Sequence, residues 1–357
     1  MLAAACALLV GSPTGAGAAP VGGPAGDIYI PEVDSDNVAV MDAATSTMKQ
    51  QIPIKTDLGP SRPAVTAKSP DGSKIYVDNF GAITPSISII DRRANTTKNM
   101  RVESIPLGIF TSGDGKEIFI PEVGFVVEVL DIATEKIVRK LRFLDVPTGA
   151  ISGPDGVMYV TFGTGLIGGY DPKTGAQVRP KIWSGGLAPF WFSITKDGSK
   201  MYTDAINSIG VIDMKSWTLT KTIATWPDNV GRLSNPGAFT SEISPDGSKL
   251  YVALFGGTGV MVFDTKTDRY LHSIPTQGYV IGMTFSGDGS RGYISDSGPS
   301  SNGIPGPPGE YTTFFNMVTV GVFSPGQMIT FDTADDHVVT TTPTGLAPGV
   351  PVWVPDL

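Results

Sequence analysis

The sequence has 357 residues, with 26 Lys or Arg, 34 Asp or Glu and two His, so its formal net charge is −8 at pH 7. This acidic balance lacks the clustered cations of a nucleic-acid-binding surface, and it excludes that class of partner. Charged residues make up 17% of the chain, below the roughly 25% of an average soluble domain. The single cysteine, Cys6, excludes a disulfide framework.

The first predicted element is an export signal over residues 1–19. An apolar run at residues 2–10 is followed by small residues that include the cleavage pattern Ala16-Gly17-Ala18. The run lacks the usual positive start, which indicates a leader that begins upstream of Met1. Cys6 lies inside the apolar run, and this position argues against a lipid anchor. We therefore expect a protein that is secreted or held at the exterior of the cell envelope, extracellular and without a transmembrane span.

A phrase built on an Asp-Gly pair then returns six times. Its first copy, at residues 69–77, reads SPDGSKIYV. Successive pairs are 41 to 49 residues apart and begin at Asp71, Asp114, Asp155, Asp197, Asp246 and Asp288. Short strands that repeat every 40 to 50 residues or so are the sequence signature of a β-propeller.

Each repeat predicts a strand, a tight turn, a strand, a loop and a third strand. The Asp-Gly pair favours a two-residue hairpin with positive φ angles, and the triplet after it is rich in β-branched and aromatic residues. The third strand ends at an aspartate, often with a threonine three residues on, a turn that side-chain oxygens close onto the backbone. The seven strand-end aspartates are Asp42, Asp91, Asp131, Asp171, Asp213, Asp264 and Asp332.

Seven such aspartates but six Asp-Gly turns indicate how the ring closes. The first unit begins directly at residues 24–30, without a first strand, whereas residues 347–354 have the pattern of a first strand and end the chain. We predict an all-β, seven-bladed β-propeller of four-stranded blades over residues 24–357. The C-terminal strand completes the first blade, which removes exposed sheet edges. A closed repeat ring is one domain, and no second domain is indicated.

The Tyr-Val pair, a short loop and a Val-x-Val-x-Asp strand together resemble the YVTN-type β-propeller repeat family over residues 24–357. The resemblance implies a seven-bladed propeller of the kind often found on secreted bacterial proteins. The family's asparagine two residues after Tyr-Val is present here at Asn79 alone, so a role for a ring of asparagines does not transfer. The other six positions hold Glu32, Glu122, Phe162, Ala205, Leu254 and Asp296.

Acidic residues are predicted to gather at one mouth of the channel, because loops between second and third strands share a rim with loops that enter first strands. An acidic mouth would suit a cationic ligand or Ca²⁺, the one cofactor indicated. Solvated turn residues are the alternative interpretation. Glu32 and Glu122, which both follow Ile-Pro, and Asp296 are the predicted metal ligands. The acidic set is Glu32, Asp34, Asp36, Asp78, Asn79, Glu122, Asp204 and Asp296.

Two irregular loops are predicted on the same rim, at residues 226–235 and at about 298–327 inside the seventh blade. Loops as long as the second are usually functional or disordered. With Phe190 and Trp191, their aromatic residues either line a pocket over the channel or plug it, and the sequence leaves both alternatives open. The predicted ligand-binding mouth comprises Glu32, Asn79, Glu122, Phe190, Trp191, Asp204, Arg232 and Asp296.

Two functions are consistent with these features. The first is an exported, monomeric, non-catalytic binding or scaffold propeller that presents the acidic mouth to a protein or small-molecule ligand. The alternative is a channel-metal hydrolase or lactonase of propeller type. The histidines, His272 and His337, are not placed beside a nucleophile, so no Ser-His-Asp triad or catalytic zinc is predicted. The candidate ligands for the alternative are Glu32, Asn79, Glu122, Asp204 and Asp296.

Overall fold

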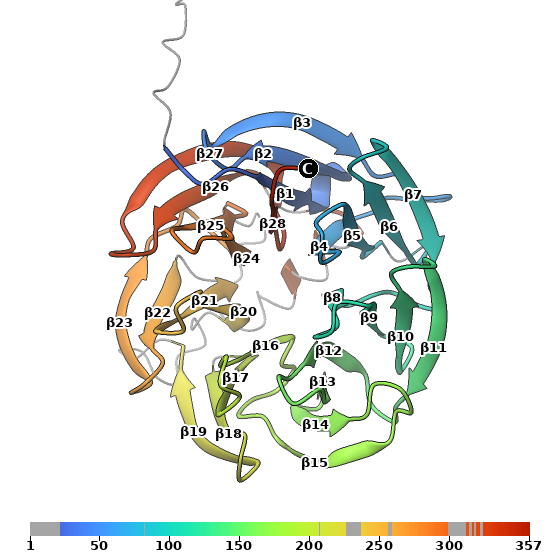
Figure 1. Cartoon of the computed structure of the whole chain (residues 1–357), viewed down its shortest axis with the longest axis vertical. Coiled ribbons are helices and arrows are strands. Elements are labelled where there is room, and N and C mark those ends of the chain that lie inside the picture. The colour runs from blue at the N-terminus through green and yellow to red at the C-terminus, as the bar shows by residue number, and fades with distance from the viewer. Residues whose placement is uncertain are drawn as a thin grey trace, which may run out of the picture.

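The computed structural model describes residues 22–81, 83–206, 208–225, 237–255, 259–298, 312–313, 316–317, 319–321 and 324–357. Within these ranges, 28 strands form seven four-stranded antiparallel sheets arranged as a ring around a channel (Figure 1). The chain is therefore an all-β seven-bladed propeller, as predicted. The predicted export signal lies outside the described residues. No helix in the described ranges is both long and apolar enough to cross a membrane.

Each blade runs outward from the channel, from its first to its fourth strand. Blade one contains β28 (Val352–Val354), β1 (Asp27–Glu32), β2 (Asn37–Asp42) and β3 (Thr47–Pro53). Blade two contains β4 (Pro63–Lys68), β5 (Lys74–Asn79), β6 (Ser86–Asp91) and β7 (Thr96–Arg101). Blade three contains β8 (Phe110–Thr111), β9 (Glu117–Glu122), β10 (Val126–Asp131) and β11 (Lys136–Arg142).

The remaining blades repeat this order. Blade four contains β12 (Pro147–Ser152), β13 (Met158–Phe162), β14 (Leu166–Tyr170) and β15 (Gln177–Trp183). Blade five contains β16 (Trp191–Ile194), β17 (Lys200–Ala205), β18 (Ser208–Asp213) and β19 (Thr218–Ala224). Blade six contains β20 (Gly237–Ile243), β21 (Lys249–Phe255), β22 (Val260–Asp264) and β23 (Arg269–Ile274). Blade seven contains β24 (Val280–Phe285), β25 (Arg291–Asp296), β26 (Pro325–Asp332) and β27 (Val338–Leu346).

The C-terminal strand closes the ring, which confirms the predicted closure. β28 pairs antiparallel with β1, and Figure 1 shows the red C-terminal strand beside the blue N-terminal one. The segment before β28 also bonds to the blades on either side. The Val350 amide donates to the Ala64 carbonyl of blade two at 2.8 Å, and the Ser297 hydroxyl of blade seven donates to the Pro348 carbonyl at 2.8 Å. The last residues of the chain therefore hold three blades together.

Five of the six Asp-Gly turns are four-residue loops, and the one at Asp155 has three residues, rather than the predicted two-residue hairpins. In the first copy, the Ser69 amide donates to the Lys74 carbonyl at 2.9 Å, and Gly72, not Asp71, has the positive φ of 68°. The Asp71 carboxylate accepts from the Ser69 hydroxyl at 2.6 Å and from the Ser73 amide at 3.0 Å. These bonds lower the pKa of Asp71 to about 2. Ser69 and Ser73 therefore stabilise the turn by donating hydrogen bonds to the Asp71 carboxylate.

Neighbouring blades are joined by the Lys-x-Tyr pair of the second strand. Lys249 and Tyr251 of β21 both donate to the buried Asp336 of blade seven, at 2.8 and 2.6 Å. Lys200 and Tyr202 of β17 make the same contacts with Asp268 of blade six. This repeated contact explains why a lysine and a tyrosine recur two residues apart after the Asp-Gly turn.

Candidate functional site

The channel has two ends that are built from different connections. We call the end formed by the Asp-Gly loops the turn rim, and the opposite end, formed by loops between second and third strands and by segments that enter first strands, the loop rim. The turn rim comprises residues 69–73, 112–116, 153–157, 195–199, 244–248 and 286–290. The described loop rim includes residues 33–36, 54–62, 83–85, 102–109, 123–125, 143–146, 184–190, 275–279 and 347–351.

Asp296, a predicted metal ligand, is buried and saturated with hydrogen bonds from its own surroundings. Its carboxylate accepts from the Gln277 amide at 2.7 Å and from the Gly278 and Gly298 amides at 3.1 Å each. The Gln327 side chain donates a fourth bond at 3.0 Å. These bonds position the segment that enters the first strand, the start of the long loop after the second strand, and the third strand. The observed role of Asp296 is therefore to fix loop geometry.

Blade two uses its polar pair in the same way. The Asp78 carboxylate accepts from the Val65 amide at 2.6 Å and so fixes the first strand against the second. Burial raises the pKa of Asp78 to about 7. The Asn79 side-chain amide donates to the hydroxyls of Ser86 and Ser88, both at 2.9 Å. Both side chains are fully buried and point into the blade rather than to solvent.

Glu32 and Glu122, which both follow an Ile-Pro step, lie in similar buried environments. Both are fully buried, and each accepts one backbone hydrogen bond, Glu32 from Gly345 at 2.6 Å and Glu122 from Ser104 at 2.5 Å. Burial raises the pKa of Glu32 above its ordinary value. For Glu122, burial and the neighbouring Glu128 carboxylate together raise the pKa to about 8. One oxygen of each carboxyl has no hydrogen-bond partner among the described residues.

The fifth acidic residue, Asp204, is also fully buried, and burial raises its pKa well above the ordinary range. The five predicted side chains thus lie in five different blades. In the described part of the chain, no three His, Cys, Asp or Glu side chains gather closely enough to hold a metal ion. Arg232 lies outside the described residues. The acidic mouth, its Ca²⁺ and the hydrolase alternative stay predictions.

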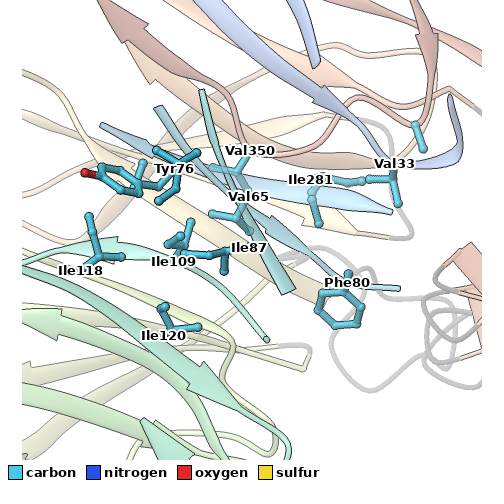
Figure 2. Close-up of a cluster of buried hydrophobic side chains, with 14 of the residues drawn as sticks. Val33, Val65, Tyr76, Phe80, Ile87, Ile109, Ile118, Ile120, Ile281 and Val350 are labelled. Carbon is cyan, nitrogen blue, oxygen red and sulfur yellow. The ribbon is translucent and has the colours of Figure 1, made fainter. Parts of the chain in front are cut away.

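Apolar side chains fill the loop-rim end of the channel. Val65 and Phe80 of blade two, Ile109 of blade three, Ile281 of blade seven and Val350 before β28 belong to one buried cluster, which we call the apolar plug (Figure 2). Phe255 of blade six, on the opposite side of the ring from blades two and three, belongs to the same cluster, so the apolar plug spans the channel. Met317, from the long loop of blade seven, is 1% exposed and belongs to the same cluster.

A row of aromatic rings extends the apolar plug across blades five, six and seven. The ring centroids of Phe190 and Phe239 are 5.6 Å apart, those of Phe239 and Phe255 are 4.9 Å apart, and those of Phe255 and Tyr279 are also 4.9 Å apart. Such offset and edge-on contacts add stability beyond the burial of apolar area. Of the two alternatives for Phe190, the structure places it in a packed aromatic row.

The turn-rim half of the channel is hollow. A cavity of about 1140 Å³ opens there, with its wall formed by the first strands of blades one to six and its edge by four Asp-Gly loops. Trp191 alone, among the described residues of the predicted mouth, lines it. This ring also packs against the apolar plug and lies 4.8 Å from the ring of Phe110, so it forms part of the cavity floor. The lining includes Lys68, Phe110, Thr111, Trp191, Ser193 and Glu242.

Two charged residues in the wall, Lys68 and Glu242, were not singled out from the sequence. They lie on β4 and β20, which Figure 1 places on opposite sides of the channel. Lys68 donates to the Trp353 carbonyl at 2.8 Å, and burial lowers its pKa. Burial alone raises the pKa of Glu242 to about 8. In the sequence, each of these residues is the charged residue near the end of a predicted first strand, and this position could have indicated a role in the channel wall.

Comparisons with known proteins support the propeller fold but assign no function. No family model matches the chain, and no curated protein does. Solved structures resemble it: hydrazine synthase from Kuenenia stuttgartiensis is 20% identical, with a TM-score of 0.63 over 83% of this chain and 90% of that one. A functionally unknown protein from Desulfotomaculum acetoxidans is 16% identical, with a TM-score of 0.67 over 93% and 100%. A protein from Lactobacillus plantarum is 12% identical, with a TM-score of 0.70 over 93% and 100%. The resemblance to YVTN repeats stays a prediction.

Proposed function

We propose that this protein is a non-catalytic binding propeller that holds a small organic ligand in the turn-rim cavity. The observation behind the proposal is the asymmetry of the channel. One end is filled by the apolar plug, whereas the other is a cavity of about 1140 Å³ with an aromatic floor. Ligand sites of proteins are typically concave, largely apolar and about 300–1,000 Å³ in volume.

The position of the wall supports a small molecule over a protein partner. Apolar side chains such as Phe110, Ile151 and Val352 share the wall with polar and charged side chains on the first strands, and the Asp-Gly loops form the edge. A flat protein surface would contact that edge and leave the wall untouched. A ligand small enough to enter would be surrounded on most of its surface, which favours affinity for compact organic molecules.

The hydroxyl groups of the wall support binding rather than catalysis. The Thr111 hydroxyl donates to the Lys68 carbonyl at 2.9 Å, and the Ser193 hydroxyl donates to the Ser241 carbonyl at 2.8 Å. A nucleophilic hydroxyl instead gives its proton to an adjacent base. These hydroxyls therefore link the first strands of adjacent blades and shape the cavity.

A fragment screen against two tryptophan variants tests the proposal. Thr111→Trp fills the cavity, whereas Thr97→Trp makes the same change on the exposed outer strand of blade two. Fragments that bind the wild-type protein by ligand-observed NMR should lose at least tenfold in affinity with Thr111→Trp and should be unaffected by Thr97→Trp. Equal binding to all three proteins would place the ligand elsewhere and would contradict the proposal.

A further inference from the structure

We infer that the cavity recognises an organic ammonium ion, a protonated amine on an apolar body, and that Glu242 is the residue that binds its charged end. This inference rests on the proposed function, because it names the ligand class of the same cavity. Glu242 lies on β20 in the cavity wall. Its carboxyl makes no hydrogen bond or ion pair with any described residue.

Two other charged residues of the cavity have partners in the protein. Glu117, at the cavity edge, pairs with Arg139 at 2.5 Å, and Lys68 donates to the Trp353 carbonyl. An unpartnered carboxyl in a largely desolvated wall costs free energy that an apolar residue would not cost. Groups that destabilise the fold in this way are expected where a side chain binds a ligand. Glu242 is therefore the wall residue that most requires a partner from outside the chain.

The aromatic rings that line the same cavity favour an ammonium over other hydrogen-bond donors. The strand that contains Trp191 runs beside β20, and the two are joined where Ser193 donates to Ser241, the residue before Glu242. Trp191 and Phe110 contact each other and both line the cavity. Ring faces attract cations, and a carboxylate forms its stronger hydrogen bonds with charged donors. A neutral hydroxyl would satisfy the carboxyl but would gain nothing from the rings.

Lys68 gives the bound ligand a direction. It lies across the channel from Glu242, and its ammonium is held by the Trp353 carbonyl and lies 5.0 Å from the centroid of the Trp353 ring. A second cation is repelled from that side of the cavity. The charged end of the ligand therefore points to blades five and six, and its apolar or hydrogen-bond-accepting end points to blade two.

Benzylamine and benzyl alcohol, which have the same ring and nearly the same size, test the inference by isothermal titration calorimetry. We expect the wild-type protein to bind benzylamine at least tenfold more tightly than benzyl alcohol. Glu242→Gln should reduce the affinity for benzylamine by at least tenfold and leave the affinity for benzyl alcohol unchanged. Thermal melting of each variant shows that it is folded.

Two further variants make the result specific. Glu117→Gln removes a carboxylate from the same cavity but from a residue with an arginine partner, so it should leave the preference for benzylamine intact. Glu242→Asp retains a carboxyl group that can bind the ammonium and should keep a clear preference. Equal affinity of the wild-type protein for both probes, no binding of benzylamine, or an equal loss with Glu117→Gln would each overturn the ammonium inference. The proposed function is judged separately, by the fragments that are sensitive to Thr111→Trp.

Discussion

The two ends of the channel are made from the same seven repeats, yet one is filled and the other is hollow. On the turn rim, each Asp-Gly loop is short and closed by its own aspartate, as in Asp71 with Ser69 and Ser73. Loops of this kind cannot reach the channel axis. On the loop rim, connections vary in length, and side chains such as Met317 extend inward to the apolar plug. Regular turns leave a cavity, and irregular loops fill one.

The comparison also concerns polar groups. Near the loop rim, four buried carboxylates accept hydrogen bonds from backbone amides, those of Glu32, Asp78, Glu122 and Asp296. Asp296 accepts three such bonds and a fourth from the Gln327 side chain. On the hollow side, Glu242 lies in the cavity wall without a partner in the described chain. These loop-rim carboxyls therefore hold nearby backbone in place, whereas the Glu242 carboxyl in the cavity wall is available to a ligand.

The largest expected effect is loss of ring closure. Deletion of residues 349–357 removes β28 and the Val350 bonds to blade two, which exposes the edge of β1. We expect the truncated protein to unfold or to oligomerise, as measured by circular dichroism and light scattering. A truncated protein that stays monomeric with an unchanged melting temperature would show that closure does not depend on this strand.

Truncation of side chains should affect the two ends differently. Phe255 is buried between Phe239 and Tyr279, so Phe255→Ala should lower the free energy of unfolding by about 3–5 kcal/mol. Thr111→Ala, in the cavity wall, removes one hydrogen bond and should cost about 1 kcal/mol. Urea denaturation measures both values. Similar losses for the two variants would mean that the hollow end is packed as tightly as the filled one.

The buried carboxyl of Glu122 should make stability depend on pH. Its pKa is about 8 in the folded protein and lies well below that in the unfolded chain. Its contribution is therefore fully present below about pH 4.5 and is lost as the pH rises toward 8. Glu122→Gln should flatten the fall in unfolding free energy between pH 5 and pH 8, by about 1 kcal/mol or more.

Glu103→Gln is the matched control for that measurement. Arg142 and Lys140 lower the pKa of the exposed Glu103 carboxyl to about 2, so this group does not titrate between pH 5 and pH 8. Because the Glu103 charge makes a small contribution to the raised pKa of Glu122, the slope of stability against pH should become only slightly shallower than that of the wild-type protein, and far less so than with Glu122→Gln. If Glu122→Gln leaves the slope unchanged as well, the Glu122 carboxyl is ionised in the folded state.

The smallest effect is expected on the outer surface of the loop rim. Leu144 is fully exposed there, and its side chain adds nothing to the apolar plug. Leu144→Ser should change the free energy of unfolding by no more than about 0.5 kcal/mol. A larger loss in urea denaturation would show that loop-rim side chains support the fold even where they face solvent.

Local hydrogen bonding made the architecture readable from the sequence. The Asp-Gly loops and the Asp-x-x-Thr turns depend on side chains that are close along the chain, as in Asp42 with Thr45. Their spacing therefore gives the number of blades, and the missing first strand at residue 24 indicates the closure. The rim on which Glu32 or Asp296 would lie follows from the same alternation of strands and turns.

Tertiary structure decided which end of the channel is open and which side chains reach it. Filling of the loop rim depends on Met317 and Phe255 meeting residues from distant blades, a contact that no local pattern encodes. The position of Glu242 depends on a β-bulge at Phe239, where the pairing of β20 with β21 shifts by one residue. Because side chains in a strand alternate between its two faces, one extra residue moves every later side chain to the other face. Sequence alternation alone therefore could not place Glu242 in the cavity wall.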